Sequence, residues 1–210
     1  DFTNYDDRQA KKILGRSLLN SELGCYLSHY GCVEKFLQTD ADYLVVLEDD
    51  LRIDNNFSST LQEILHYLHS QKNIEWSLIN IAAKKNKISR EIFRTHDYSL
   101  VRAYYFPIRG VGLVWSRQGA HDFLKMAQNP CLPVDIFFQN WLIKNGKGLS
   151  IWPPLVRPAG LDSDILGTVA TERVRRKQKE NRDFSFFMKK QLRLLKNNIL
   201  AYINFLSFKS

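Results

Sequence analysis

Tyr43-Leu44-Val45-Val46-Leu47-Glu48-Asp49-Asp50 is the stretch of this sequence that decides its fold class. Five apolar residues without polar alternation predict a strand that is buried on both faces, as in an α/β sheet. Three consecutive acids then end the strand abruptly. In open α/β sheets ligands bind at the carboxyl ends of the strands, so this acidic triplet is the first candidate site.

Helical and strand patterns alternate around this segment, which favours an α/β sandwich in which helices flank a sheet. Helices are expected at 22–38, from 58–60 onward, at 117–127 and from 133 to about 144. Strands are expected at 76–81, 100–106, 111–115 and 149–152. Asn20 or Ser21 is expected to cap the first of these helices, and residues 84–90 are expected to form a surface loop.

The net charge of +8 is concentrated at the C-terminal end of the chain. Positions 1–171 contain 19 Lys/Arg and 19 Asp/Glu, so positions 172–210 carry the whole excess. We therefore expect a neutral domain over 1–171 and a basic tail over 172–210. A neutral domain argues against nucleic acid as a partner.

Apolar residues recur at helical spacing in the tail, with lysines and arginines between them: Met188, Leu192, Leu195, Ile199, Tyr202 and Leu206. This pattern predicts a basic amphipathic helix. Such a helix, together with the aromatic residues of the tail, suits an anionic membrane surface. The alternative is a helix that packs on the domain or on another subunit.

The cysteines are Cys25, Cys32 and Cys131. An odd number without close pairs argues against a disulfide framework and fits a reducing compartment. Cys25 and Cys32 lie in one expected helix, and we interpret them as small buried apolar residues. The sequence contains no CxxC pair of the kind found in structural zinc sites.

The acidic triplet has a chemical explanation. Adjacent carboxylates raise one another's pKa, and a divalent cation removes that cost. Carboxylate oxygens are ligands that suit Mn²⁺ or Mg²⁺, so we interpret Glu48 and Asp50 as metal ligands. The alternative is a solvated turn in which Asp50 or Asp54 caps the next helix.

Several motifs in order resemble glycosyltransferase family 25, which includes bacterial lipooligosaccharide glycosyltransferases. The resemblance begins at 22–29 (ELGCYLSH), continues at 47–51 (LEDDL) and 110–120 (GVGLVWSRQGA), and ends at 133–135 (PVD) and 153–156 (PPLV). It implies a GT-A-like mixed sheet flanked by helices, a nucleotide-sugar donor and a Mn²⁺ or Mg²⁺ cofactor. The cation would bridge the two phosphates of the donor.

The resemblance also implies roles for single residues. Asp135 is the expected general base, although an Asp that opens a helix can equally be an N-cap. Donor binding is expected of Ser28, His29, Asp49, Gly110 and Gly112. The two glycines would let the backbone approach a sugar closely, or else mark a bulge or turn. Arg157 and the cluster 162–164 are weaker candidates for donor contact.

The implied reaction is inverting transfer of a hexose, galactose or glucose, from a UDP-sugar to a lipooligosaccharide or lipopolysaccharide core. The acceptor would be lipid-linked, and the enzyme would be cytoplasmic and peripheral at the inner face of the bacterial inner membrane. Family members usually begin with a further strand, whereas only residues 1–17 precede the first motif, so we expect that strand to be missing. A metal-dependent phosphohydrolase and a non-catalytic nucleotide-sugar-binding relative remain alternatives.

Overall fold

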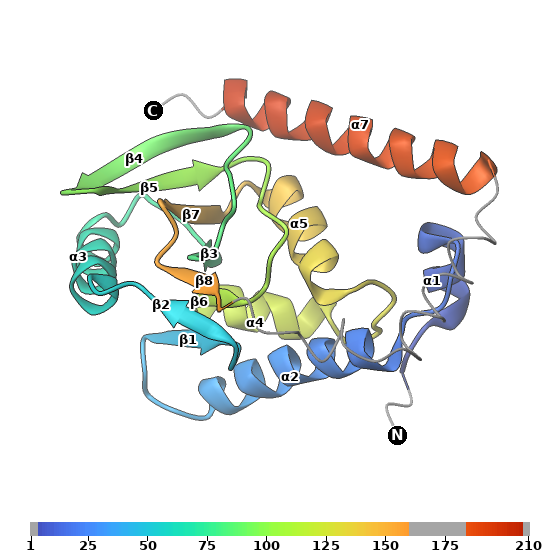
Figure 1. Cartoon of the computed structure of the whole chain (residues 1–210), viewed down its shortest axis with the longest axis horizontal. Helices are drawn as coiled ribbons and strands as arrows, with labels where there is room; N and C mark the ends of the chain where they lie inside the picture. The colour runs from blue at the N-terminus through green and yellow to red at the C-terminus, as the bar shows by residue number, and fades with distance from the viewer. Residues whose placement is uncertain (1–3, 160–183, 208–210) are drawn as a thin grey trace.

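The computed structural model describes residues 4–159 and 184–207. The helices are α1 (Asp7–Leu14), α2 (Asn20–Leu37), α3 (Phe57–Ser70), α4 (Arg117–Met126), α5 (Val134–Asn145) and α7 (Phe184–Ser207). The strands are β1 (Tyr43–Leu47), β2 (Leu51–Ile53), β3 (Leu78–Asn80), β4 (Ser89–Thr95), β5 (Tyr98–Ala103), β6 (Gly112–Ser116), β7 (Gly148–Trp152) and β8 (Val156–Pro158). This order confirms the predicted mixed α/β class (Figure 1).

Six of the strands form one mixed sheet in the order β1-β6-β3-β7-β5-β4. Strands β3 and β7 are parallel, and the other neighbours are antiparallel. The carboxyl ends of β1 and β3 therefore lie at the same edge of the sheet as the start of β6. Strands β2 and β8 pair separately as a two-stranded ribbon directly after the acidic triplet.

The central strands are buried on both faces because alternate side chains enter two different cores. Leu113 and Trp115 pack into the core beneath α2, α4 and α5. Val114, between them, packs into the core beneath α3. The helices thus cover both faces of the sheet, α3 on one side and α2, α4 and α5 on the other (Figure 1).

The prediction that 43–47 is buried on both faces is wrong, although the bounds of the strand are as predicted. Among the described residues, strand β1 lies at the edge of the sheet and pairs with β6 alone. Leu44 and Val46 pack against the core beneath α2, whereas Val45 and Leu47 are 38% and 37% exposed. The continuous apolar run therefore marks an edge strand, and the fully buried strands are β3 and β6.

Other elements also differ from the sequence predictions. The expected loop at 84–90 overlaps the start of β4, a polar edge strand in a hairpin with β5. Neither α1 nor the β2–β8 ribbon was predicted. Helix α2 begins two residues earlier than expected with Leu19 as its N-cap, because Glu22 accepts the Leu19 N–H at 2.9 Å. Cys32 is exposed, so its interpretation as a buried apolar residue is wrong.

Arg117 fixes the connection between α2 and β1. Its guanidinium donates to the carbonyl oxygens of Thr39 and Ala41, each at 2.6 Å. It also lies over the Phe36 ring, 5.4 Å from the ring centroid. The side chain therefore joins the start of α4 to the turn that leads into β1.

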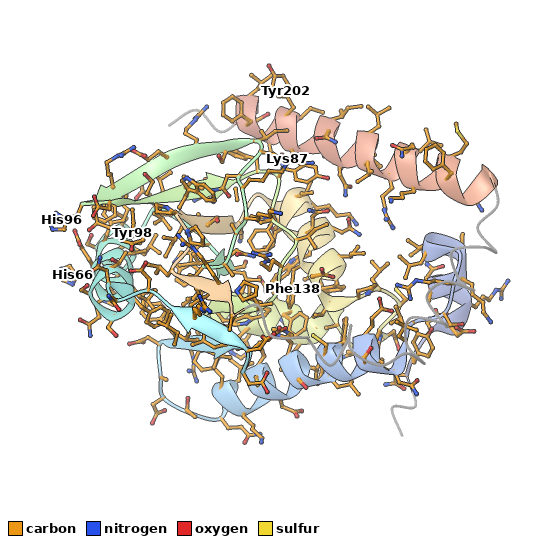
Figure 2. The ribbon with its side chains drawn as sticks, in the orientation of Figure 1. His66, Lys87, His96, Tyr98, Phe138 and Tyr202 are labelled. Atoms are coloured by element: carbon orange, nitrogen blue, oxygen red, sulfur yellow. The ribbon has the colours of Figure 1, made fainter. Side chains whose placement is uncertain are left out.

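Helix α7 packs on the domain through a small apolar cluster, in which Ala201 is buried with Tyr104, Tyr105 and Ile143, and through polar groups. Asn197 donates to Asn140 Oδ1 (3.0 Å) and Asn204 donates to Ile143 O (2.7 Å), both on α5. The opposite side of α7 carries exposed apolar side chains, and Figure 2 shows Tyr202 pointing away from the domain. The predicted boundary at 171/172, residues 172–183 and the cluster 162–164 lie outside the described residues. None of the described helices is long and apolar enough to span a bilayer.

Candidate functional site

Four carboxylates meet where β1 ends. Glu48, Asp49 and Asp50 follow β1, and Asp135 lies in the first turn of α5. Glu48 interacts electrostatically with all three of the others. The strand end is held in place because the Glu48 N–H donates to Val111 O at 3.0 Å and the Ala159 N–H donates to Asp50 O at 2.8 Å. The structure thus brings together three of the predicted metal and donor residues with the predicted base.

The electrostatics of Glu48 favour a positively charged partner. Burial raises the pKa of Glu48, and the nearby carboxylates of Asp50, Asp49 and Asp135 raise it further. Ionised Glu48 is therefore destabilised both by loss of water and by like charge. A bound cation would relieve both effects, which is the chemistry predicted from the acidic triplet.

Asp135 is half-buried at the start of α5, and its Oδ1 accepts a 2.7 Å hydrogen bond from the Ile136 N–H. Burial raises the pKa of Asp135, the bond from Ile136 opposes this rise, and the Glu22 carboxylate adds to it. The residue is not the N-cap of α5, because Pro133 occupies that position. A carboxylate with a raised pKa at the rim of a site is suited to accept a proton.

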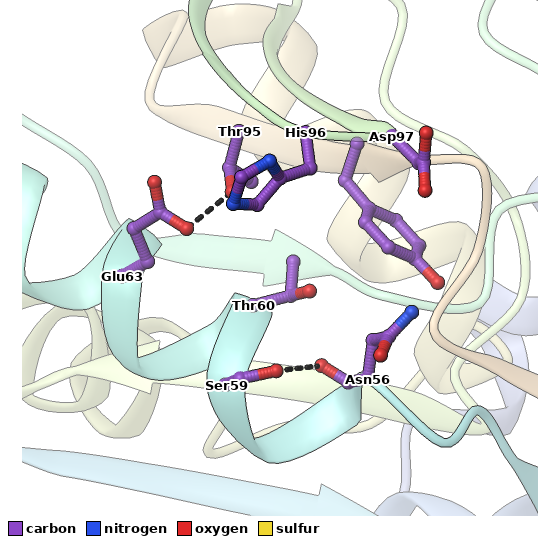
Figure 3. Close-up of a pocket in the computed structure, with 8 residues that line it drawn as sticks. Asn56, Ser59, Thr60, Glu63, Thr95, His96 and Asp97 are labelled. Carbon is purple, nitrogen blue, oxygen red and sulfur yellow. Dashed lines mark hydrogen bonds between the residues drawn. The ribbon is translucent and has the colours of Figure 1, made fainter.

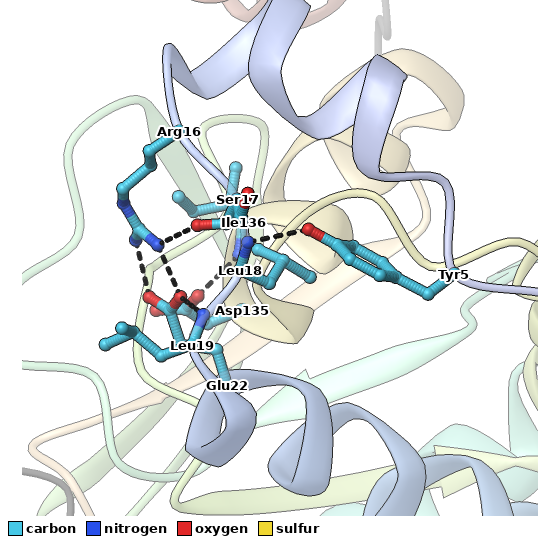
Figure 4. A network of polar contacts seen from close by, with 8 residues as sticks. All are labelled: Tyr5, Arg16, Ser17, Leu18, Leu19, Glu22, Asp135 and Ile136. Carbon is cyan, nitrogen blue, oxygen red and sulfur yellow. Dashed lines mark hydrogen bonds and ion pairs between the residues drawn. The ribbon is translucent and has the colours of Figure 1, made fainter. Parts of the chain in front are cut away.

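An arginine–glutamate pair lies beside Asp135 (Figure 4). Arg16 donates to both carboxylate oxygens of Glu22 at 2.6 Å, and Glu22 also caps α2 through Leu19. The two side chains are 16% exposed. Arg16 therefore neutralises the Glu22 charge and fixes the first turn of α2 next to the start of α5.

Cys25 and His29 face the acidic strand end from α2. A ring nitrogen of His29, Sγ of Cys25 and a carboxylate oxygen of Glu48 all lie within 4.8 Å of one another. His29 is 3% exposed, burial lowers its pKa to about 4, and its Nδ1 has no hydrogen-bond partner. Burial, helped by Glu48 and Asp135, raises the pKa of the Cys25 thiol to about 11. The site therefore contains a neutral imidazole and a neutral thiol next to its carboxylates.

The two predicted glycines have different environments. A Cβ built on Gly110 would lie 3.5 Å from His29 Nε2, so Gly110 lies beside the cluster. Gly112 is buried in β6 opposite Leu47, and a Cβ there would lie only 2.4 Å from Val156 Cγ2. Close packing of β6 against β8 therefore accounts for Gly112, and its contact with a donor stays a prediction.

Ser28 and Asp49 are exposed. The Ser28 hydroxyl donates to Gly24 O at 3.0 Å, within its own helix. Neighbouring residues on a helix point about 100° apart, so Ser28 and His29 face different directions. The donor-binding roles of Ser28, His29 and Asp49 stay predictions.

Three contributors to the site were missed in the sequence. Cys25 was interpreted only as a packing residue, although its spacing of four from His29 places both on one face of a helix. Glu22 was quoted only as part of a motif. Asn80 ends β3, and its side chain donates to Arg109 O (2.7 Å) and accepts from the Ala82 N–H (2.9 Å). Asn80 thereby anchors the loop that leads to Gly110.

A separate pocket lies between the start of α3 and the turn of the β4–β5 hairpin (Figure 3). Its volume is about 460 Å³, and it is lined by Asn56, Ser59, Thr60, Glu63, Thr95, His96, Asp97 and Tyr98. The Thr95 hydroxyl donates to Glu63 across one side of it. None of the predicted site residues lines this pocket, so it is distinct from the acidic strand end.

Comparison with known proteins gives this geometry a context. The chain is 36% identical to procollagen galactosyltransferase 1 of Danio rerio over 127 residues, which cover 59% of this chain and 20% of that protein. It is 38% identical to procollagen galactosyltransferase 1-B of Xenopus laevis over 124 residues, which again cover 59% of this chain and 20% of that protein. It is 33% identical to the probable inactive glycosyltransferase 25 family member 3 of Bos taurus over 126 residues, which cover 59% of this chain and 20% of that protein.

The chain spans about a fifth of the length of these curated relatives. The family profile described as glycosyltransferase family 25 (LPS biosynthesis protein) matches residues 1–138. That range contains Glu48, Asp50 and Asp135, together with the predicted donor-binding residues Ser28, His29, Asp49, Gly110 and Gly112, whereas the weaker candidates Arg157 and 162–164 lie beyond it. Because the match extends over more than half of the 210 residues, the chain belongs to glycosyltransferase family 25.

Proposed function

We propose that this chain transfers a hexose, galactose or glucose, from a UDP-sugar to a hydroxyl of a lipooligosaccharide or lipopolysaccharide core. The observation that carries the proposal is the electrostatic interaction of Glu48 with Asp49, Asp50 and Asp135 at the end of β1, within the segment that matches the family. The galactosyltransferase names of two relatives support galactose. The description of the family as an LPS biosynthesis protein supports the acceptor.

The residues fit a hard divalent cation. Glu48 and Asp50 provide carboxylate oxygens, and burial, together with the neighbouring carboxylates of Asp50, Asp49 and Asp135, raises the pKa of Glu48. Mn²⁺ or Mg²⁺ held there would supply neutralisation of the diphosphate charge as UDP leaves. Arg52 and Arg157 are further candidates for the phosphates, because they pair directly across the β2–β8 ribbon just beyond Asp50. Two like charges that face each other in this way favour an anion between them.

Asp135 would take the proton. The acceptor hydroxyl loses its hydrogen to the Asp135 carboxylate as its oxygen bonds to the anomeric carbon of the donor. The bond between that carbon and the diphosphate breaks, and UDP departs with the electron pair. Attack opposite the leaving group inverts the anomeric configuration, so an inverted product is expected.

We also propose that α7 binds an anionic membrane surface. Eight apolar side chains of α7 are 42–59% exposed: Phe187, Met188, Leu192, Leu195, Ile199, Tyr202, Ile203 and Leu206. Lys189, Lys190 and Lys196 are exposed on the same helix, which contains no acidic residue. This combination of charge and apolar surface matches a lipid interface with negative headgroups. Docking there would place the enzyme beside a lipid-linked acceptor at the cytoplasmic face of the inner membrane.

A catalytically inactive relative is the second candidate function. Its support is the similarity to a mammalian family member described as probably inactive. Such a chain would bind a UDP-sugar without turning it over. A phosphohydrolase is disfavoured by the family assignment.

One experiment separates these functions. The protein is incubated with Mn²⁺ and a panel of UDP-sugars, with and without a lipooligosaccharide acceptor, and UDP and inorganic phosphate are measured. UDP release that requires the acceptor supports transfer. Donor binding without UDP release indicates the inactive relative, and phosphate release without acceptor indicates a hydrolase.

A further inference from the structure

Cys25, His29 and Glu48 form a compact set of metal-ligand atoms on the inner side of the acidic strand end. Cys25 and His29 lie one turn apart on α2, and Glu48 comes from the end of β1. Their ligand atoms lie within 4.8 Å of one another. Two rigid elements thus present three different ligand types to one point.

The buried imidazole gives an independent reason to expect a ligand. His29 is 3% exposed, and its Nδ1 is buried without a hydrogen-bond partner in the described part of the chain. Buried polar atoms almost always have a partner, so an unpartnered nitrogen requires an explanation. The other ring nitrogen faces Gly110, where even a Cβ would come within 3.5 Å. An ion that accepts a nitrogen lone pair would satisfy the imidazole.

The mixture of ligands selects the type of ion. A thiolate and an imidazole are soft or borderline ligands, which Mn²⁺ and Mg²⁺ do not prefer. Zn²⁺ binds cysteine, histidine and a carboxylate together, commonly with three protein ligands and one open position. We propose that Cys25, His29 and Glu48 bind a zinc ion that fastens α2 to the acidic strand end.

This zinc ion is additional to the hard cation proposed at Glu48 and Asp50. A carboxylate has two oxygens, so Glu48 can serve the zinc with one and the hard cation with the other. The sets remain separable by mutation because Cys25 and His29 belong only to the zinc site and Asp50 belongs only to the other.

The test measures zinc in the protein itself. The full chain is loaded with zinc, desalted and assayed for metal content, and Co²⁺ is then substituted to reveal thiolate coordination in its absorption spectrum. We expect one zinc per chain and a sulfur-to-cobalt charge-transfer band. Cys25→Ser and His29→Asn should each lose the retained ion, and Cys25→Ser should lose the band.

Cys32→Ser is the matched control, since Cys32 lies on the same helix but is exposed and outside the cluster. It should keep both the ion and the band. Equal zinc retention by Cys25→Ser and Cys32→Ser would overturn the proposal. Absence of the cobalt band from the wild-type protein would overturn it as well. This second outcome does not depend on whether the variants fold. Because no donor or acceptor is present, this test is independent of the proposed transfer reaction.

Discussion

Helices α2 and α7 both pack against α5, but α2 buries large apolar side chains whereas α7 leaves many of its own exposed. Helix α2 buries Tyr26, Val33 and Phe36 in the main core. Helix α7 contacts α5 through Ala201, Asn197 and Asn204, and it leaves Leu192 and Leu195 more than half exposed. An amphipathic pattern therefore identifies the apolar side of a helix but does not tell which side faces the domain.

Replacing Asp135 by Asn should have the largest effect, because α5 presents this residue to the site next to α2. We expect kcat to fall by about 10²–10⁴-fold, since general-base catalysis contributes that much. Binding of the UDP-sugar, measured by calorimetry with Mn²⁺, should change little. Asp97→Asn, at the exposed hairpin turn, is the control and should keep full activity; an active Asp135→Asn enzyme would remove the assigned base.

Truncating one side chain on each helix tests the comparison directly. Tyr26→Ala on α2 should lower the free energy of unfolding by about 3–5 kcal/mol, because Tyr26 is fully buried and its ring packs against Phe123 and Phe137. Leu195→Ala on α7, where the side chain is 57% exposed, should change it by less than about 0.5 kcal/mol. Urea unfolding of both variants measures the difference, and equal losses would mean that α7 is covered in solution.

The pH dependence of stability should reveal the buried imidazole of α2. Burial lowers the pKa of His29 from 6.5 to about 4, so between these values the unfolded chain binds more protons than the folded chain. This contribution is present above pH 6.5 and is lost as the pH falls toward 4, with a total of about 3 kcal/mol. The measurement compares urea unfolding of wild type and His29→Leu across this range in EDTA.

His66→Asn is the control for that experiment, because His66 is exposed on α3. It should follow the wild-type pH curve. Parallel curves for wild type and His29→Leu would show that His29 titrates normally.

The exposed side of α7 should determine membrane binding. Each of its residues should contribute less free energy to this binding than Tyr26 contributes to the stability of the fold. The triple substitution of Leu192, Leu195 and Ile199 by Ser should weaken sedimentation with anionic liposomes at least about tenfold, since each buried apolar side chain contributes to partitioning. High salt should weaken wild-type binding through the lysines. Substituting Ser for Ile53 and Met126, which are 54% and 47% exposed elsewhere, should leave binding unchanged. Undiminished binding of the triple variant would exclude the proposed surface.

The sequence was sufficient for the class of the fold and for most of its central elements. The bounds of β1 are as predicted, and α4 and α5 match to within a residue or two because each has a clear start and stop: Ser116 accepts the Gly119 N–H and Gly146 ends α5 in a left-handed conformation. Strand β4 was missed because its polar residues do not alternate regularly with apolar ones. The edge position of β1 was missed because strand order depends on pairing between distant segments.

The candidate site was predicted in part. Glu48, after its strand, and Asp135, after Pro133, adjoin recognisable patterns and lie near each other in the fold, while their roles stay predictions. Cys25 was not assigned a role because a cysteine in an apolar helix usually packs. Only the fold shows that α2 passes over the end of β1, so that the helix face of Cys25 and His29 meets Glu48.

Arg117 donates hydrogen bonds to the turn between α2 and β1, and these bonds also affect the far end of β1, where the carboxylates lie. Because β1 is short and extended, we expect a shift at its first residue, Tyr43, to displace its last residue, Leu47, as well. We therefore expect Arg117 to influence the position of the carboxylates from the far end of β1, although it is not one of the candidate site residues. We therefore expect substitutions at Arg117, at the base of α4, to shift the candidate site without changing any of its residues.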